Sequence, residues 1–224
     1  MSPPSPFSWR AALQALAQPG SPPPPALPGT AFILLVLCLA TVAVLIWLGY
    51  AWHNEPHHYF RERKIGTYLS FVNLLATGGV SALVARRLGP APFARFWWLM
   101  AGLLVWMACD DLFIIHEDMD RAIHALLGLD PNHPITDHLD DLIVASYGMA
   151  ALALAWIHRA HLASFPWMVM ILAVAFGLFA AMVVLDFAHV SKTAEDAFKV
   201  VAGTLILVGF LAAWLDTTTT GGPR

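Results

Sequence analysis

Charged residues are scarce in this chain. Asp, Glu, Lys and Arg make up 12% of its 224 residues, and hydrophobic residues make up 58%. Soluble globular domains carry about 25% charged residues. This composition excludes an ordinary water-soluble domain and indicates an integral membrane protein.

Cysteine is nearly absent, and so are the common nucleotide-binding motifs. Cys38 and Cys109 both lie inside long apolar runs, so we interpret them as small buried hydrophobic residues and not as a disulfide framework. The sequence contains no P-loop, no dinucleotide-binding glycine motif, no CxxC pair and no internal repeat. The formal net charge is −3 and there is no basic stripe, which argues against nucleic-acid binding.

Six apolar runs are each long enough to cross a membrane. About 20 helical residues, at roughly 1.5 Å per residue, span a hydrocarbon core of about 30 Å. The sequence therefore predicts an all-α fold, an integral membrane bundle of six transmembrane helices. The predicted spans lie near residues 30–52, 66–85, 96–116, 139–158, 165–188 and 197–215. We expect residues 30–216 to form one transmembrane domain, followed by a short polar tail at 217–224.

The first 29 residues differ sharply from the rest of the chain. They hold nine of the sixteen prolines, including the run PPPP. The stretch AALQALAQ within them is too weakly apolar for the core of a signal peptide. We therefore expect residues 1–29 to be a disordered, proline-rich cytoplasmic tail.

Acidic residues concentrate on one side of the predicted bundle. The first, third and fifth connections between spans, with the helix ends beside them, hold fourteen of the fifteen Asp and Glu. The second and fourth connections, RRLGPAPFAR and HRAHLASF, are basic and contain no carboxylate. Because basic connections favour the cytoplasm, we expect a multi-pass protein of the bacterial inner (plasma) membrane with cytoplasmic termini and an outward-facing acidic side. The number of Lys and Arg residues is the same on the two sides. The predicted orientation therefore depends on the second and fourth connections, which are basic and contain no carboxylate.

The most unusual stretch is ACDDLFIIHEDMDRAIH, residues 108–124, which continues an uncharged apolar run. In an unbroken helix, Asp110, Glu117 and His124 recur every seven residues along one face. Asp110 then lies about 10 Å inside the apolar layer, where one carboxylate costs about 2.5–3.5 kcal/mol. Asp111 adds to this cost, so a proton, a cation or a metal ion must neutralise the pair.

The second span and the connection before it bring further polar residues to this side. Ser70 and Asn73 belong to a stripe of small and polar residues, which is typical of helix packing. Asn73 also lies at the expected depth of the buried carboxylates and is placed to hydrogen-bond one of them. The connection WHNEPHH, residues 52–58, has enough histidines for a transition metal, although solvated histidines at an interface are equally common.

The later spans contribute acids and one histidine. Asp186 and His189, three residues apart at the end of the fifth span, can present two ligands to one ion. Asp141 is the deepest carboxylate at the start of the fourth span, where the helix N-terminus favours negative charge. Glu195 opens the sixth span and is spaced to form an i, i+4 ion pair with Lys199.

Three of these motifs resemble a known but uncharacterised family. RERKIGTYLS before the second span, DDLFIIHE closing the third and EDAFKVVAG opening the sixth are similar to motifs of small bacterial multi-spanning membrane proteins. Members of that family show an acidic pair followed by HE, and another acidic pair at the start of the last helix. The resemblance covers roughly residues 55–215 and implies no particular chemistry. Asp111 stands where the family pattern has Glu.

A more distant similarity is to the alkaline ceramidase-like membrane hydrolases, which hold zinc with His and Asp near a Ser. Ser70, Asp110, His116 and His189 imitate such a site. The HxxxH motif of their last helix is missing, since the sixth span contains no histidine. We therefore do not assign the chain to that group.

Our leading hypothesis is a polar site near the outer membrane face that acts as a metal-dependent hydrolase on a lipid or membrane-soluble substrate. Carboxylates with histidines suit Zn, Mn or Fe, which activate water. The expected metal ligands are Asp110, His116, Asp186 and His189. Catalytic roles fall to Glu117, as general base, and Ser70. The residues expected to orient the ligands are Asn73, Asp111, Asp141 and Glu195.

Two alternatives belong to other functional classes. In a proton- or cation-coupled transporter, the buried acids are titrating sites. In an accessory subunit of a membrane complex, the acidic face docks a partner, and a haem held by His116 and His189 is one form of this reading. A visible absorption spectrum separates a haem from a colourless metal.

Overall fold

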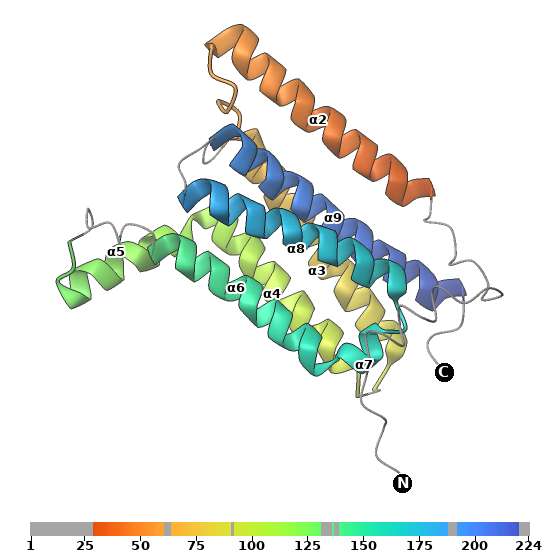
Figure 1. Cartoon of the computed structure of the whole chain (residues 1–224). Helices are drawn as coiled ribbons and strands as arrows, with labels where there is room; N and C mark the ends of the chain where they lie inside the picture. The colour runs from red at the N-terminus through yellow and green to blue at the C-terminus, as the bar shows by residue number, and fades with distance from the viewer. Residues whose placement is uncertain are drawn as a thin grey trace.

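A computed structural model describes residues 29–60, 64–90, 92–130, 136, 139–187 and 192–219. Within these ranges the secondary structure consists of eight helices and no strand. Figure 1 shows them as α2 (Gly29–His53), α3 (Ile65–Leu88), α4 (Ala94–Phe113), α5 (Ile115–Leu127), α6 (Leu139–Ile157), α7 (Arg159–Leu162), α8 (Pro166–Phe187) and α9 (Lys192–Thr219). The proline-rich residues 1–28 lie outside the described part of the chain.

Six helices of the described part are long and apolar enough to cross a membrane: α2, α3, α4, α6, α8 and α9. This confirms the predicted all-α bundle of six transmembrane helices. The chain is a multi-pass membrane protein, and consecutive spans run in opposite directions. The ends of α2, α4 and α8 therefore lie at the same side as the starts of α3, α6 and α9 (Figure 1).

The prediction of one unbroken helix through residues 108–124 is wrong. α4 ends at Phe113, and Ile114 has the left-handed backbone angles φ 58° and ψ 42°. This conformation is a genuine outlier for a β-branched residue, because its Cβ crowds the backbone. The chain turns there and α5 extends away from the bundle (Figure 1). Asp110 and Glu117, on opposite sides of the turn, therefore do not share one helical face.

Helix α9 lies at the centre of the bundle, where it packs against α2, α3 and α8, while α3 also packs against α4. Gly78 lets α3 and α4 approach closely. A Cβ at this position would lie 3.1 Å from Val105 Cγ2 and 3.3 Å from the carbonyl oxygen of Ala101. The small residues of α3 therefore serve in helix packing at this point, as their spacing predicts.

The α6 span is the least buried of the six. It packs against α4, α5 and α7, and its exposed apolar side chains include Leu142, Met149 and Leu152. α2 is also peripheral and packs against α9. In a bilayer, lipid covers such exposed apolar surfaces.

Candidate functional site

A cavity of about 730 Å³ lies at the acidic side of the bundle. This volume is within the range of small-molecule binding sites, about 300–1,000 Å³. Its lining comes from α3, α4, α6, α8 and α9, with His116 from α5, Ile114 from the turn before it, and His57 and Phe60 from the segment between α2 and α3. Six carboxylates line it: Asp110, Asp111, Asp140, Asp141, Glu195 and Asp196. Among the lining residues these face one lysine, Lys199, and two histidines, so the cavity is strongly acidic.

Asp110 and Asp111, in the last turn of α4, are the most deeply buried acids of this cavity. Their exposed fractions are 3% and 8%. His116 Nδ1 donates a hydrogen bond to Asp110 Oδ2 at 2.9 Å, and Lys199 Nζ donates one to Asp111 Oδ1 at 2.5 Å. Asp110 Oδ1 and Asp111 Oδ2 are also buried, and neither has a hydrogen-bond partner among the described residues. Each carboxylate is therefore half satisfied: one of its two oxygens has a hydrogen-bond partner in the described part of the chain and the other has none. This is unusual for a buried polar group.

The turn at Ile114 brings His116 onto Asp110. In a regular helix, residues six apart point in very different directions and do not meet. The left-handed residue between them redirects the chain, so that the imidazole of His116 reaches the carboxylate. Backbone outliers of this kind gather at functional sites. We therefore regard this corner as part of the site.

Lys199 approaches the site from α9. We expected its ammonium to pair with Glu195, but the structure places it on Asp111, 88 positions away in the sequence. The ion pair ties the start of α9 to the end of α4. Glu195 itself lines the cavity.

Ser70, Asp141 and Glu195 line the cavity, and their catalytic and supporting roles stay predictions. Asn73 does not bind a carboxylate, contrary to our expectation. Its Nδ2 donates to Thr204 Oγ1 at 2.8 Å, because α9 and not α4 faces that side of α3.

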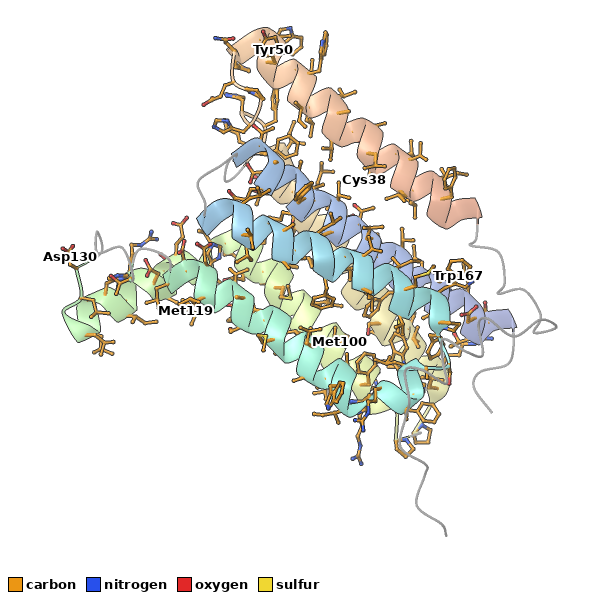
Figure 2. All side chains as sticks on the ribbon, in the orientation of Figure 1. Cys38, Tyr50, Met100, Met119, Asp130 and Trp167 are labelled. Atoms are coloured by element: carbon orange, nitrogen blue, oxygen red, sulfur yellow. The ribbon has the colours of Figure 1, made fainter. Side chains whose placement is uncertain are left out.

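Thr204 extends this contact to a third helix. Its Oγ1 is 2.9 Å from the sulfur of Cys38, which lies where α2 faces α9 (Figure 2). Cys38 and Cys109 are both free thiols, as their positions predict. This polar contact therefore joins α3, α9 and α2 without a disulfide.

Glu117 lies outside the cavity lining, on α5. Its Oε2 accepts a hydrogen bond from Arg121 Nη1 at 3.0 Å, and Asp118 accepts one from Arg121 Nη2. These two carboxylates, Asp118 first, raise the pKa of the Arg121 guanidinium. This position gives Glu117 no direct access to the two buried acids of α4.

Two of the expected ligands are not placed by the structure. Asp186 belongs to the last turn of α8, but its side chain is outside the described part, and so is the whole of His189. Their metal-binding roles, and the haem alternative that uses His189, stay predictions. Within the described ranges, no group of three or more His, Cys, Asp or Glu is placed to hold a metal ion.

The segment WHNEPHH folds into a compact turn after α2. Glu55 Oε1 lies 3.2 Å from His57 Nε2, and the rings of His53 and His58 stack with centroids 3.6 Å apart. His57 belongs to the cavity lining. We did not expect His57 at the site, nor Lys199 and Tyr147, because none of them is near the DDLFIIHE motif in sequence.

The chain belongs to an uncharacterised protein family. The pattern of a domain of unknown function (DUF8692) matches residues 30–214, which covers all six spans. No curated protein and no solved structure matches the chain. The resemblance to an uncharacterised family is thus supported, whereas these comparisons give no support to the similarity with alkaline ceramidase-like hydrolases.

Proposed function

We propose that this membrane protein binds a divalent cation at Asp110 and Asp111 and uses it to hydrolyse a lipid or another membrane-soluble substrate. One observation carries the proposal. Two adjacent, buried carboxylates each have one oxygen without a hydrogen-bond partner in the described structure, beside an acidic cavity.

Electrostatics favour a cation at this position. A buried polar group without its hydrogen bond costs about 1–3 kcal/mol, and more when it is charged. A divalent cation would supply the missing partner of Asp110 Oδ1 or Asp111 Oδ2, since carboxylate oxygens are good ligands for hard divalent cations such as Mn. It also offsets part of the charge of the six carboxylates that line the cavity.

His116 is suited to the same site. A histidine that binds a metal commonly donates its other ring N–H to a carboxylate. His116 Nδ1 is hydrogen-bonded to Asp110 Oδ2, so Nε2 is the atom that would bind a metal. Since His116, Asp110 and Asp111 do not converge on one point in the described structure, a bound ion would have to draw them together. Asp186 and His189 remain candidates for further ligand positions, and water or substrate completes the coordination.

The proposed reaction is the addition of water to an ester or amide of the substrate. A bound cation would supply a more acidic water and polarise the substrate carbonyl. Asp141 and Glu195, which line the cavity, are the candidates for the general base that takes a proton from the attacking water. Water adds to the acyl carbon, the bond to the leaving group breaks, and the same carboxylate returns the proton to that group. Glu117 is less suitable as this base because it lies outside the cavity and binds Arg121.

The test is metal analysis of protein purified without chelator. We expect wild-type protein to retain metal and Asp110→Asn or Asp111→Asn to lose it. Added metal should raise the melting temperature of the wild type only, since a ligand of the folded state stabilises it by mass action. Asp118→Asn is the matched control, because Asp118 is an exposed carboxylate that pairs with Arg121. Metal-free wild-type protein would overturn the proposal.

A proton-coupled carrier is the second candidate, favoured by the hydrogen bond between His116 and Asp110. In that case a proton, and not a metal ion, neutralises the half-satisfied acids. Metal-free wild-type protein that takes up protons when reconstituted, and loses this with Asp110→Asn, would establish it.

The proposed site faces away from the cytoplasm of a bacterial inner membrane, since the even connections are basic. Single cysteines at Asn132 and Pro92, in a background with Cys38→Ala and Cys109→Ala, test this. An impermeant thiol reagent added to whole cells should label only the cysteine at Asn132. Labelling at Pro92 alone would reverse the orientation while leaving the cavity unchanged.

A further inference from the structure

The cavity has a polar outer end and a largely apolar inner end. Its carboxylates lie in the first or last turns of their helices, at one end of the bundle. Leu74, Met107 and Phe179 line it one to two turns farther from those helix ends, and Gly203 leaves open space there. At about 1.5 Å per residue, the inner end lies several ångströms inside the hydrocarbon layer. Such a gradient fits an amphiphile better than a fully polar solute.

α6 and α8 are not closely packed on one another in the described part of the chain. Both helices contribute to the lining, α6 through Val144 and Tyr147 and α8 through Phe179 and Met182. In the described part, α6 packs against α4, α5 and α7, whereas α8 packs against α9. Figure 1 draws both helices in front of α3 and α4, on the viewer's side of the bundle. The cavity therefore borders the bilayer along this seam.

The charge of the cavity selects the head group of the ligand. Six carboxylates face one lysine, and a bound divalent cation would still leave negative charge in excess. An anionic phosphate head group is repelled by such a lining, while an ammonium group is attracted. With a cation at Asp110 and Asp111, the carboxylates that remain for the ammonium group are Asp140, Asp141, Glu195 and Asp196.

We propose that the ligand of this cavity is an amphiphile with a protonated amine in its head group, which reaches the cavity from the bilayer between α6 and α8. This inference deepens the proposed function by naming its substrate class. The ammonium lies among the carboxylates of the outer end, and the alkyl chain lies along Leu74, Met107 and Phe179. A second prediction follows for the chain, since a longer chain buries more apolar surface in the inner end.

Binding in nanodiscs of zwitterionic lipid tests the head-group preference. Dodecylamine and dodecyl phosphate are compared, after subtraction of their binding to protein-free nanodiscs. We expect dodecylamine to bind at least about tenfold more tightly, a difference of roughly 1.4 kcal/mol. Equal affinity, or a preference for the phosphate, would overturn the inference. Metal content is measured on the same samples. Metal-loaded protein without a preference for the amine would overturn the ligand inference but keep the cation site. Metal-free protein that prefers the amine would overturn the cation site but keep the ligand inference.

Gly203→Leu tests the position of the chain. Gly203 lines the cavity, and a Cβ there would make only ordinary contact with Asn73, 3.8 Å from its Cβ, so we choose this position to narrow the inner end. We expect this variant to bind dodecylamine about tenfold more weakly and hexylamine nearly unchanged. Gly102→Leu is the control, because Gly102 is exposed on α4 and has no neighbouring atom within 4 Å. Unchanged binding of both amines to folded Gly203→Leu would refute this placement.

Photolabelling of the wild type tests the route and needs no variant. A dodecylamine with a diazirine in its chain is irradiated on the protein in nanodiscs, and labelled peptides are identified by mass spectrometry. We expect labels on Val144, Phe179 and Met182, reduced by excess dodecylamine. Labels restricted to the outer surfaces of α2 and α3, or insensitive to competition, would show ordinary lipid contact and refute the route.

Discussion

The two membrane faces of this bundle are built in opposite ways. At the basic face, the side chain of Trp97 has 0% exposure and its ring meets those of Phe96, Phe165 and Phe210 edge to face. At the acidic face, the same helices diverge around a cavity of about 730 Å³. A dense aromatic cluster holds the helices together at one end, so the other end can stay open without separating them.

Histidines show the same contrast. At the basic face, His161 Nε2 accepts a hydrogen bond from Trp97 Nε1 at 3.1 Å, and its ring stacks on Phe93. Burial, followed by the nearby His158, lowers the pKa of His161 to about 4. This imidazole is therefore neutral near pH 7 and serves packing. At the acidic face, His116 donates to a buried carboxylate beside the cavity, which suits chemistry.

Trp97→Ala should have the largest effect on stability. Removing a fully buried Trp costs about 3–5 kcal/mol, since the cavity left behind adds to the lost transfer free energy. Phe179→Ala at the acidic face should cost clearly less, because Phe179 already borders open space. Unfolding of both variants in matched detergent measures the difference. Equal losses would contradict the division into a packed and an open face.

Lys199→Met should have an intermediate effect. It leaves Asp111 buried without its ammonium partner, and an unpaired group of this kind costs about 1–3 kcal/mol. The double variant Asp111→Asn with Lys199→Met should recover most of the loss, because both charges are then gone. A double-mutant cycle of unfolding free energies measures this coupling. Purely additive losses would show that the ion pair does not hold α4 and α9 together.

Acidification should weaken the basic face through His161. The pKa of His161 is lowered on folding to about 4, whereas that of an unfolded histidine is about 6.5. The unfolded chain therefore binds a proton first, and stability falls as pH decreases from about 6.5 to 4. His161→Phe should lose this part of the pH dependence, while His53→Phe at the other face should keep it. Melting curves between pH 7 and 4 provide the comparison.

Hydropathy predicts the six helices because each span must be apolar along its whole length. The acidic motif predicts a polar site for the same physical reason, since two carboxylates in an apolar helix need compensation. Contacts between residues far apart in the sequence could not be predicted in this way. Lys199 meets Asp111 only because α9 lies in the middle of the bundle, and nothing in either local sequence encodes that position.

The break at Ile114 was equally hidden from the sequence. The residues around it, LFIIHE, contain neither glycine nor proline, so local propensity favours a continuous helix. The physical reason for the break lies in tertiary structure, where Ile114 is buried and lines the cavity. Patterns of seven-residue spacing cannot reveal such a turn.

Ile114 has a consequence for how this protein tolerates change. Glycine would adopt the left-handed conformation without the roughly 1–2 kcal/mol that a side chain with Cβ costs there. It would also remove the buried side chain that forms the corner between α4 and α5 and release the direction in which α5 leaves it. The lost burial, about 2–5 kcal/mol for a large aliphatic side chain, exceeds the strain that glycine relieves. Selection for heat resistance should therefore keep a large side chain at 114, and Ile114→Gly should lose both stability and the fixed orientation of His116.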